Sequence, residues 1–250
     1  MIKAEHISKS YRQGFFSSRK QEVVLDISFH MKKGTTFGLL GSSGCGKSTV
    51  ARMIMGILKP EKGQILIEGT DPQAMDRKTR GQIMQMIFQQ PEESFDPEMR
   101  LGKSIAEPME VNEIGTAAER KGKIEALMEQ LNLPMQILNR YPHQISGGEA
   151  QRLAIIRALT LEPQILLLDE PTSMLDVSTQ AQILNILKEL QKSRGLTYLF
   201  ITHDAGAARW MCDEIAVMDQ GRIIEYGPTE QVFAEPKEKW TKELLFSWQI

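Results

Sequence analysis

A glycine-rich segment between an apolar run and an apolar helical pattern constrains the fold more than any other part of this sequence. Residues 41–49 read GSSGCGKST, which satisfies the pattern GxxxxGK[ST]. The run before it, residues 36–40, has the length and composition of a buried strand, and Met53, Ile54 and Ile57 after it recur at helical spacing. A strand, a glycine-rich loop and a helix in this order predict an α/β fold of the P-loop type.

The chemistry of this loop indicates a bound nucleotide. Glycines let the backbone turn so that its N–H groups point inward, and the positive end of the following helix lies under the phosphates. Lys47 is expected to bridge the β- and γ-phosphates, and the Ser48 hydroxyl to ligate Mg²⁺. The residues predicted to contact the nucleotide here are Gly41, Ser42, Ser43, Gly44, Cys45, Gly46, Lys47, Ser48 and Thr49.

A plain glycine-rich turn is the alternative to a phosphate loop. The pattern arises by chance in about one per cent of chains of this length, and the strand before it and helix after it make chance rarer still. The pattern does not identify the reaction, because kinases, GTPases and many motors share it.

Charge and cysteine usage exclude several kinds of protein. A formal net charge of −2 over 250 residues gives no broad cationic field that would attract nucleic acid or anionic lipid. Cys45 and Cys212 are too few and too far apart for a disulfide framework or a CxxC site, which favours a reducing cytosol. No stretch approaches the roughly 18 apolar residues of a spanning helix, and the first residues do not read as a secretory signal. If the protein serves a membrane process, other chains are expected to supply the span.

The rest of the sequence divides into strand-rich parts and a helical insertion. Two further apolar runs predict buried parallel strands at 165–168 and 197–201, and helical spacing predicts a helix over 178–193 that stops at Gly195. Alternating patterns predict antiparallel strands near 2–7, 23–31 and 64–68. Strand signals vanish over about 99–161, where helical periodicity takes over.

These patterns predict one domain with an inserted helical part. An α/β core with a mixed sheet and an N-terminal antiparallel β subdomain is expected over about 1–88 and 162–250. The α-helical subdomain is expected over 98–161, and the segment 12–21 is expected to be a loop.

Polar residues follow three of the predicted strands where a parallel sheet binds ligands. Asp169 and Glu170 close the apolar run LLLDE, so that Asp169 can hold Mg²⁺ while Glu170 orients a water for attack on the γ-phosphate. Gln89 follows a strand at about 84–88, and His203 follows the strand at 197–201. Alone, each has an ordinary explanation, a surface cap or a satisfied polar side chain. Four strands are expected to bring Lys47, Gln89, Glu170 and His203 to one edge of the sheet, which favours a catalytic role for these residues.

Residues 145–152 read ISGGEAQR and connect these patterns to one kind of enzyme. An ordinary serine N-cap with glycine flexibility is the alternative reading. The segment resembles the signature sequence of ABC ATPases, and it stands between Gln89 and the Asp169 strand in the order that this superfamily shows. The resemblance covers nearly the whole chain. It includes Tyr11 where an aromatic ring stacks on adenine, Gln89 as the Q-loop, residues 173–176 as the D-loop and His203 as the switch histidine.

The resemblance implies a fold, a reaction and an assembly. It implies hydrolysis of ATP with Mg²⁺, which Ser48, Gln89 and Asp169 would hold, and a dimer that buries ATP at its interface. The residues that would face the partner's nucleotide are Ser146, Gly147, Gly148, Glu149 and Asp176. Departures from the family pattern are Ile145 for Leu, Glu149 for Gln and Met174 for Ala. Glu149 keeps a favourable charge in the first turn of its helix but lacks an amide donor.

A second resemblance concerns the cargo. Residues 90–97, QPEESFDP, and 105–109, IAEPM, are similar to the region after the Q-loop in peptide and nickel importers, and the C-terminal Pro236, Trp240, Thr241, Leu244 and Leu245 are similar to a degraded form of their ending. Extra residues between Tyr11 and Val23 are usual in the second, F-type ATPase of those systems.

The implied protein is a peripheral subunit on the cytoplasmic face of the membrane that powers import of peptides, nickel, cobalt or metallophore complexes. Its implied direct partners are two transmembrane permease subunits and a second ABC ATPase, with which it would form a heterodimer; a homodimer is left open. An extracytoplasmic substrate-binding protein is an indirect partner, and no nucleic acid is expected to bind. The alternatives are a non-transport ABC ATPase acting on ribosomes or DNA, a P-loop kinase and an exporter.

Overall fold

The computed structural model describes residues 1–12 and 20–246, and most of the segment predicted as a loop at 12–21 lies outside them. The strands are β1 (Ile2–Arg12), β2 (Lys20–Met31), β3 (Thr36–Gly41), β4 (Lys62–Ile67), β5 (Met84–Ile87), β6 (Ile165–Asp169), β7 (Thr197–Thr202), β8 (Glu214–Asp219) and β9 (Arg222–Pro228). The α-helices are α1 (Lys47–Ile54), α2 (Arg77–Ile83), α3 (Leu101–Val111), α4 (Ala117–Gln130), α5 (Gly147–Leu159), α6 (Val177–Arg194), α7 (Ala205–Met211), α8 (Thr229–Ala234) and α9 (Lys239–Phe246). Short 3₁₀ helices are η1 (Pro91–Ser94), η2 (Met135–Asn139) and η3 (Pro142–Gln144).

The larger sheet positions the catalytic edge. Its strand order is β5-β6-β7-β3-β8-β9, with β5, β6, β7, β3 and β8 parallel and β9 antiparallel to β8. Side chains of the central strands alternate between two cores, as Leu166 and Leu168 pack with the helices on one face while Leu167 packs on the other. Because both faces are covered, these strands read as continuous apolar runs, and the three predicted buried strands are confirmed.

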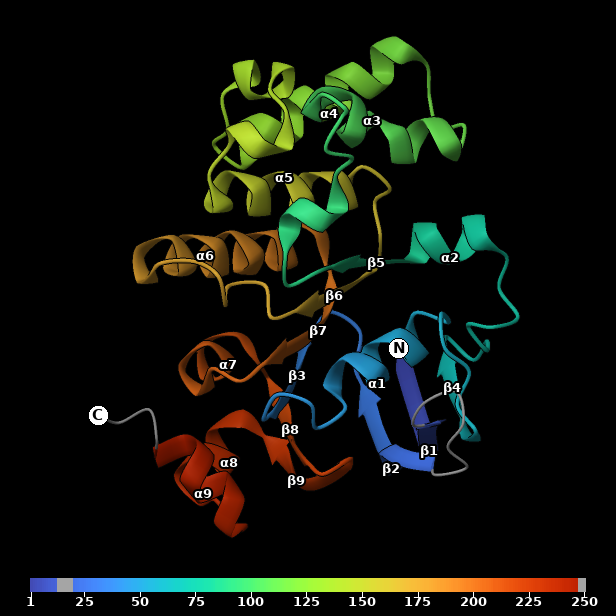
Figure 1. Ribbon diagram of the computed structural model, residues 1–250, viewed down its shortest axis with the longest axis vertical. Helices are drawn as coiled ribbons and strands as arrows, with labels where there is room; N and C mark the ends of the chain where they lie inside the picture. The colour runs from blue at the N-terminus through green and yellow to red at the C-terminus, as the bar shows by residue number, and fades with distance from the viewer. Residues whose placement is uncertain (13–19, 247–250) are drawn as a thin grey trace.

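The N-terminal strands form the predicted antiparallel subdomain. The three-stranded sheet has the order β2-β1-β4, with Ile2 opposite Met31 on one side and opposite Ile67 on the other. Phe29 of β2 stacks on Phe37 of β3 at 5.0 Å between ring centroids. This aromatic contact and the shared core around α1 join the small sheet to the large one. Figure 1 shows β1, β2 and β4 near α1.

Helices α3, α4 and α5 lie together at the top of Figure 1, on the chain between β5 and β6, where the sequence predicted helical structure. Helix α6 closely matches the helix predicted over 178–193. Asp176 caps its N-terminus, and Gly195 ends it with a φ of 64°.

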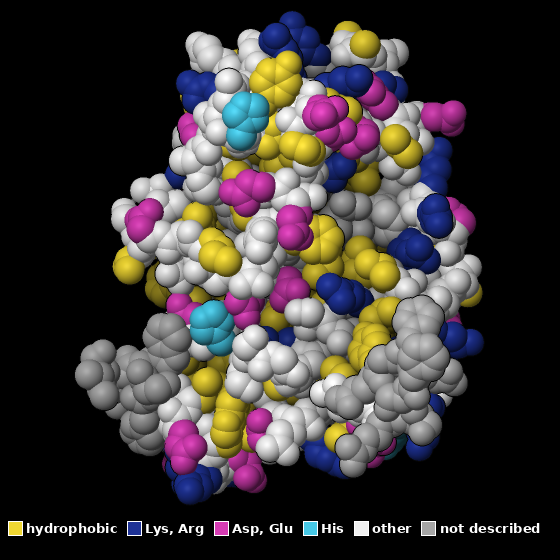
Figure 2. Space-filling view, viewed as in Figure 1, with side chains coloured by type: hydrophobic (Ala, Val, Ile, Leu, Met, Phe, Trp, Pro, Cys, Tyr) yellow, Lys and Arg dark blue, Asp and Glu magenta, His cyan; other side chains and the backbone are white. Residues whose placement is uncertain are grey.

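None of the helices in residues 1–12 and 20–246 is both long and apolar enough to cross a membrane. Figure 2 shows acidic and basic side chains interspersed over the face in view.

The hairpin of β8 and β9 is a part of the sheet that the sequence patterns did not predict. Its two-residue turn, Gln220 and Gly221, has positive φ at both positions, 42° and 80°, as a tight hairpin requires. The turn also supports the glycine-rich loop, since the Gly221 N–H donates to the Cys45 carbonyl at 3.1 Å while the Leu25 N–H donates to the Gly221 carbonyl at 2.7 Å.

Candidate nucleotide-binding and hydrolysis site

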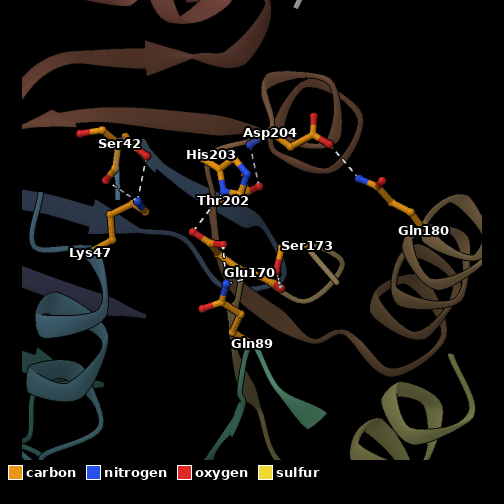
Figure 3. A network of polar contacts seen from close by, with 10 residues as sticks. Ser42, Lys47, Gln89, Glu170, Ser173, Gln180, Thr202, His203 and Asp204 are labelled. Carbon is orange, nitrogen blue, oxygen red and sulfur yellow. Dashed lines mark hydrogen bonds and ion pairs between the residues drawn. The ribbon is translucent and has the colours of Figure 1, made fainter. Parts of the chain in front are cut away.

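The glycine-rich loop follows β3 and leads directly into α1. Gly46 stands before the helix with a φ of 111°, and a Cβ there would lie 2.5 Å from the Val23 carbonyl oxygen, so the position excludes other residues. The Lys47 ammonium donates to the carbonyls of Gly41 and Ser42, at 2.8 Å each, which closes the loop around the lysine side chain (Figure 3).

A cavity of about 180 Å³ lies over this loop. Its lining joins most of the predicted phosphate and metal residues: Ser43, Gly44, Gly46, Lys47, Ser48, Thr49, Gln89, Asp169 and Glu170. Gly41 and Ser42 contact Lys47 instead, and the Cys45 side chain is buried behind the loop, where burial raises the pKa of its thiol. Val23 also lines the cavity and was not predicted. Tyr11, half-exposed near the end of β1, is not part of the lining.

Asp169 and Ser48 meet in the cavity, as a magnesium site would require. Burial raises the pKa of the Asp169 carboxyl above its usual range, while a hydrogen bond with the Ser48 side chain and the charge of Lys47 oppose this effect. A nearby divalent cation would favour the ionised form of such a carboxylate. Carboxylate, hydroxyl and amide oxygens are the ligands that Mg²⁺ prefers, so the residues here fit the metal.

Glu170 lies between two of the other predicted catalytic side chains, those of Gln89 and His203. Its Oε2 accepts from the Gln89 Nε2 at 3.1 Å, and its Oε1 lies 3.2 Å from the His203 Nδ1 (Figure 3). The Glu170 side chain is only 14% exposed, whereas that of His203 is 48% exposed. The parallel pairing of β5 with β6 and of β6 with β7 brings the three residues together, as the sequence predicted.

The backbone of Glu170 is held in an unusual conformation. Its φ is 49°, a left-handed value that costs free energy for a residue with a Cβ and is common at functional sites. The Ser173 Oγ donates to the Glu170 carbonyl at 3.2 Å and lies 3.4 Å from the Gln89 amide nitrogen. The turn after β6 therefore contacts both the backbone of Glu170 and the Gln89 amide that donates to its carboxylate.

The signature residues lie in a different cavity, of about 270 Å³. Its lining consists of Ser146, Gly147, Gly148, Glu149, Arg152, Met174, Leu175, Asp176 and Thr179, none of which lines the cavity over Lys47. Asp176 caps α6 by accepting from the Thr179 N–H at 3.0 Å and the Thr179 hydroxyl at 2.7 Å. Within one chain, the structure does not bring the signature and the glycine-rich loop together.

Ser146 and Glu149 cap α5 reciprocally. The Glu149 Oε2 accepts from the Ser146 N–H at 2.8 Å and from the Ser146 hydroxyl at 2.9 Å, and the Glu149 N–H donates to the Ser146 Oγ at 3.3 Å. The Ser146 N–H is the main cause that lowers the pKa of the Glu149 carboxyl. The sequence analysis treated Glu149 only as the loss of an amide donor, although the S-x-x-E spacing is a readable signal for this capping box.

Hydrogen bonds behind His203 were also missed. Asp204 caps α7 by accepting from the Ala207 N–H at 2.8 Å, and its second oxygen accepts from the Gln180 Nε2 at 2.7 Å. Gln180 belongs to α6, 24 positions earlier in the chain, so no local pattern could have indicated the contact.

Known proteins are similar to this chain over most of its length. The family described as ABC transporter matches residues 24–173. The dipeptide transport ATP-binding protein DppF of Haemophilus influenzae is 40% identical, over 98% of this chain and 77% of that protein. The oligopeptide transport ATP-binding protein OppF of Bacillus subtilis is 41% identical, over 95% and 80%.

Solved structures are similar over most of the fold. The dimeric ATP-binding cassette MJ0796 in a post-hydrolysis state with ADP and Pi has a TM-score of 0.82 and 28% identity, over 92% of this chain and 99% of that chain. CbiO1 of Clostridium perfringens, part of an ABC transporter complex, has a TM-score of 0.81 and 30% identity, over 94% and 90%. The chain therefore belongs to the ABC transporter family, as one of its ATP-binding, ATP-hydrolysing subunits.

Proposed function

We propose that ATP is hydrolysed in the cavity over Lys47 by a water that Glu170 orients. The observation that carries this proposal is the position of the Glu170 carboxylate between Gln89 and His203, in the lining of the same cavity. A carboxylate held by two partners can accept a proton from the attacking water, and the His203 imidazole can interact with the γ-phosphate.

The phosphates have their own binding groups. Lys47 and the backbone amides of residues 41–49 bind the β- and γ-phosphates, and Tyr11 stacks on the adenine. Ser48, Asp169 and Gln89 would hold Mg²⁺, which neutralises charge on the phosphate oxygens when bound. The hydrogen bond between the Asp169 and Ser48 side chains, and the place of both residues with Gln89 in the lining of one cavity, support this assignment.

We further propose that the working form is a dimer in which each signature faces the partner's ATP. Ser146, Gly147, Gly148, Glu149 and Asp176 lie in a cavity that shares no lining with the cavity over Lys47, which supports a site that a second subunit would complete. Two apolar side chains beside the signature are exposed, Met174 at 63% and Val177 at 83%, and a partner would cover them. The related cassette MJ0796 is described as a dimer with ADP and Pi.

The transported substrate is proposed to be a peptide. The relatives at about 40% identity are named as dipeptide and oligopeptide transport proteins, and the segment at 90–97 resembles those importers. Nickel, cobalt and metallophore complexes are the other cargoes that the resemblance allows. The proposed assembly has two permease subunits, a second, related ATPase and an extracytoplasmic binding protein, with this chain on the cytoplasmic face.

A groove beside Gln89 is the proposed contact with a permease. It has a volume of about 270 Å³ and runs between the edge strand β5 and helix α5. Phe88, the residue before Gln89, is 39% exposed in this groove, together with Met55 and Met86. A permease segment seated there would press on the residue next to the one that contacts Glu170. In this proposal, 98–161 act as a helical subdomain on the core formed by 1–88 and 162–250.

Affinity purification of a Glu170→Gln variant from native membranes with ATP tests the assembly. We expect permease subunits and a second ATPase to co-purify, and less of the second ATPase with a Lys47→Ala variant that binds ATP weakly. Recovery of ribosomes or DNA in place of membrane subunits would support a non-transport ABC ATPase and reject the proposal.

A further inference from the structure

The segment that carries His203 is anchored on both sides of the histidine. The Thr202 hydroxyl oxygen, in a residue that is 4% exposed, accepts from the Asp204 N–H at 2.9 Å. The Asp204 carboxylate accepts from the Ala207 N–H with one oxygen and from the Gln180 Nε2 with the other. Figure 3 shows the contacts of Asp204 with Gln180 and with Thr202, beside His203.

His203 itself has little to hold it. Its side chain is 48% exposed, and within the described part of the chain its Nδ1 lies 3.2 Å from the Glu170 Oε1. The position of the imidazole therefore depends on its backbone, and so on the two anchored neighbours. Of these anchors, the Thr202 and Ala207 bonds are local, whereas the Gln180 bond comes from another helix.

Gln180 occupies the first turns of α6, next to Thr179. Thr179 bonds to Asp176 and lies against Gly148, where a Cβ would be 2.6 Å from the Thr179 methyl group. The same helical segment thus contacts the signature cavity through Thr179 and the histidine segment through Gln180.

We propose that Gln180 is a positioning residue for ATP hydrolysis, acting through Asp204 to hold His203 against Glu170. Its amide is the donor that satisfies the second oxygen of a part-buried carboxylate, so its removal lets Asp204 and the start of α7 move. Gln180 does not line the cavity over Lys47, and its amide donates to Asp204, so ATP binding is expected not to depend on it. The inference rests on the proposed roles of Glu170 and His203.

The decisive variants exchange donor and acceptor across this bond. Gln180→Glu places a carboxylate opposite that of Asp204, and we expect kcat to fall about tenfold with an unchanged KM for ATP. Adding Asp204→Asn supplies an amide donor to the new carboxylate and keeps a good N-cap, so the exchanged pair should recover to within about threefold of wild type. Hydrolysis is measured on the transporter co-purified through a tag on this chain.

A purely structural role is distinguished by two further measurements. In a His203→Ala background, Gln180→Ala should cause no additional loss in single-turnover phosphate release, because the residue acts through the imidazole. Gln191→Glu is the matched control, since Gln191 donates from the other end of α6 to the Thr36 hydroxyl at 2.8 Å and should leave kcat unchanged. Unfolding temperatures are measured for every variant, and Gln180→Ala replaces Gln180→Glu if the latter does not fold.

Wild-type kcat in both Gln180 variants, or equal losses with and without His203, would overturn the inference. Failure of the underlying function gives a different result, because Glu170→Gln would then retain turnover. Loss of turnover in Glu170→Gln with silent Gln180 variants rejects the inference alone.

Discussion

Replacing Glu170 by Gln separates ATP binding from hydrolysis in this site. The amide has the shape of the carboxylate, and its oxygen can still accept from the Gln89 Nε2 at the present 3.1 Å. It cannot take a proton from water, and it removes the charge that lies 3.2 Å from His203. Groups that accept or donate a proton in the transition state contribute about 10²- to 10⁴-fold. We therefore expect kcat to fall by about that factor, which is about 3 to 5 kcal/mol on the barrier.

Nucleotide affinity should stay within about twofold of wild type, because the phosphate contacts proposed for Lys47 and the loop amides are untouched. The assays are phosphate release in a single turnover, calorimetric titration with ATP, and size-exclusion chromatography for the trapped dimer. Glu162→Gln is a matched control. Glu162 also has a left-handed backbone, with a φ of 52° against 49° for Glu170, but its carboxylate pairs with Lys123.

Retention of more than about a tenth of wild-type turnover by Glu170→Gln would reject Glu170 as the group that activates water. Loss of ATP binding in the same variant would also contradict the reasoning, since it would mean that Glu170 supports the phosphate loop. Equal loss in Glu162→Gln would indicate a general effect on folding.

Three further predictions concern other parts of the molecule. Lys47→Ala should weaken ATP binding at least about tenfold by calorimetry, whereas Lys33→Ala, an exposed lysine before β3, should not. Glu149→Gln should reduce the acid sensitivity of the unfolding temperature. The pKa of the Glu149 carboxyl is lower in the folded protein than its ordinary value of 4.5, so this group stabilises the fold above pH 4.5 and the contribution is lost as the pH falls through the pKa of the folded state. An unchanged dependence of the unfolding temperature on pH would contradict the capping role. Phe88→Asp should abolish co-purification of permease subunits but leave ATP affinity unchanged, and full recovery of the complex would place the contact elsewhere.

The sequence predicted the parts of the fold whose patterns are local. Strands β3, β6 and β7 are covered on both faces, so each appears as an uninterrupted apolar run. The hairpin of β8 and β9 was missed although residues 215–218 are apolar, because Gln220 is an unusual residue for a left-handed turn position and weakens the turn signal.

The residues of the candidate site also divide into those that local sequence patterns predict and those that they do not. Lys47, Gln89, Glu170 and His203 were predictable since each follows a strand of one parallel sheet, and such strand ends meet at one edge. The bond of Gln180 to Asp204 was not predictable, because the packing of α6 against α7 decides it. The stacking of Tyr11 on adenine stays a prediction, as this residue does not line the cavity over Lys47.

In the proposed dimer, the first turns of α6 connect two nucleotides. Thr179 contacts the signature cavity that would receive the partner's γ-phosphate, and Gln180 holds the segment that carries this chain's own His203. Thr179 at one site and Gln180 at the other are neighbours in α6, so hydrolysis at the two sites should be coupled.

The two sites should also differ from each other in a heterodimer. Of the two ATP molecules, only the one bound to the partner's phosphate loop would face Glu149. The Glu149 carboxylate already accepts from the Ser146 N–H and hydroxyl, and its charge would repel a phosphate. The site completed by this signature should accordingly bind ATP more weakly than the one built on Lys47, if the partner carries glutamine at the matching position.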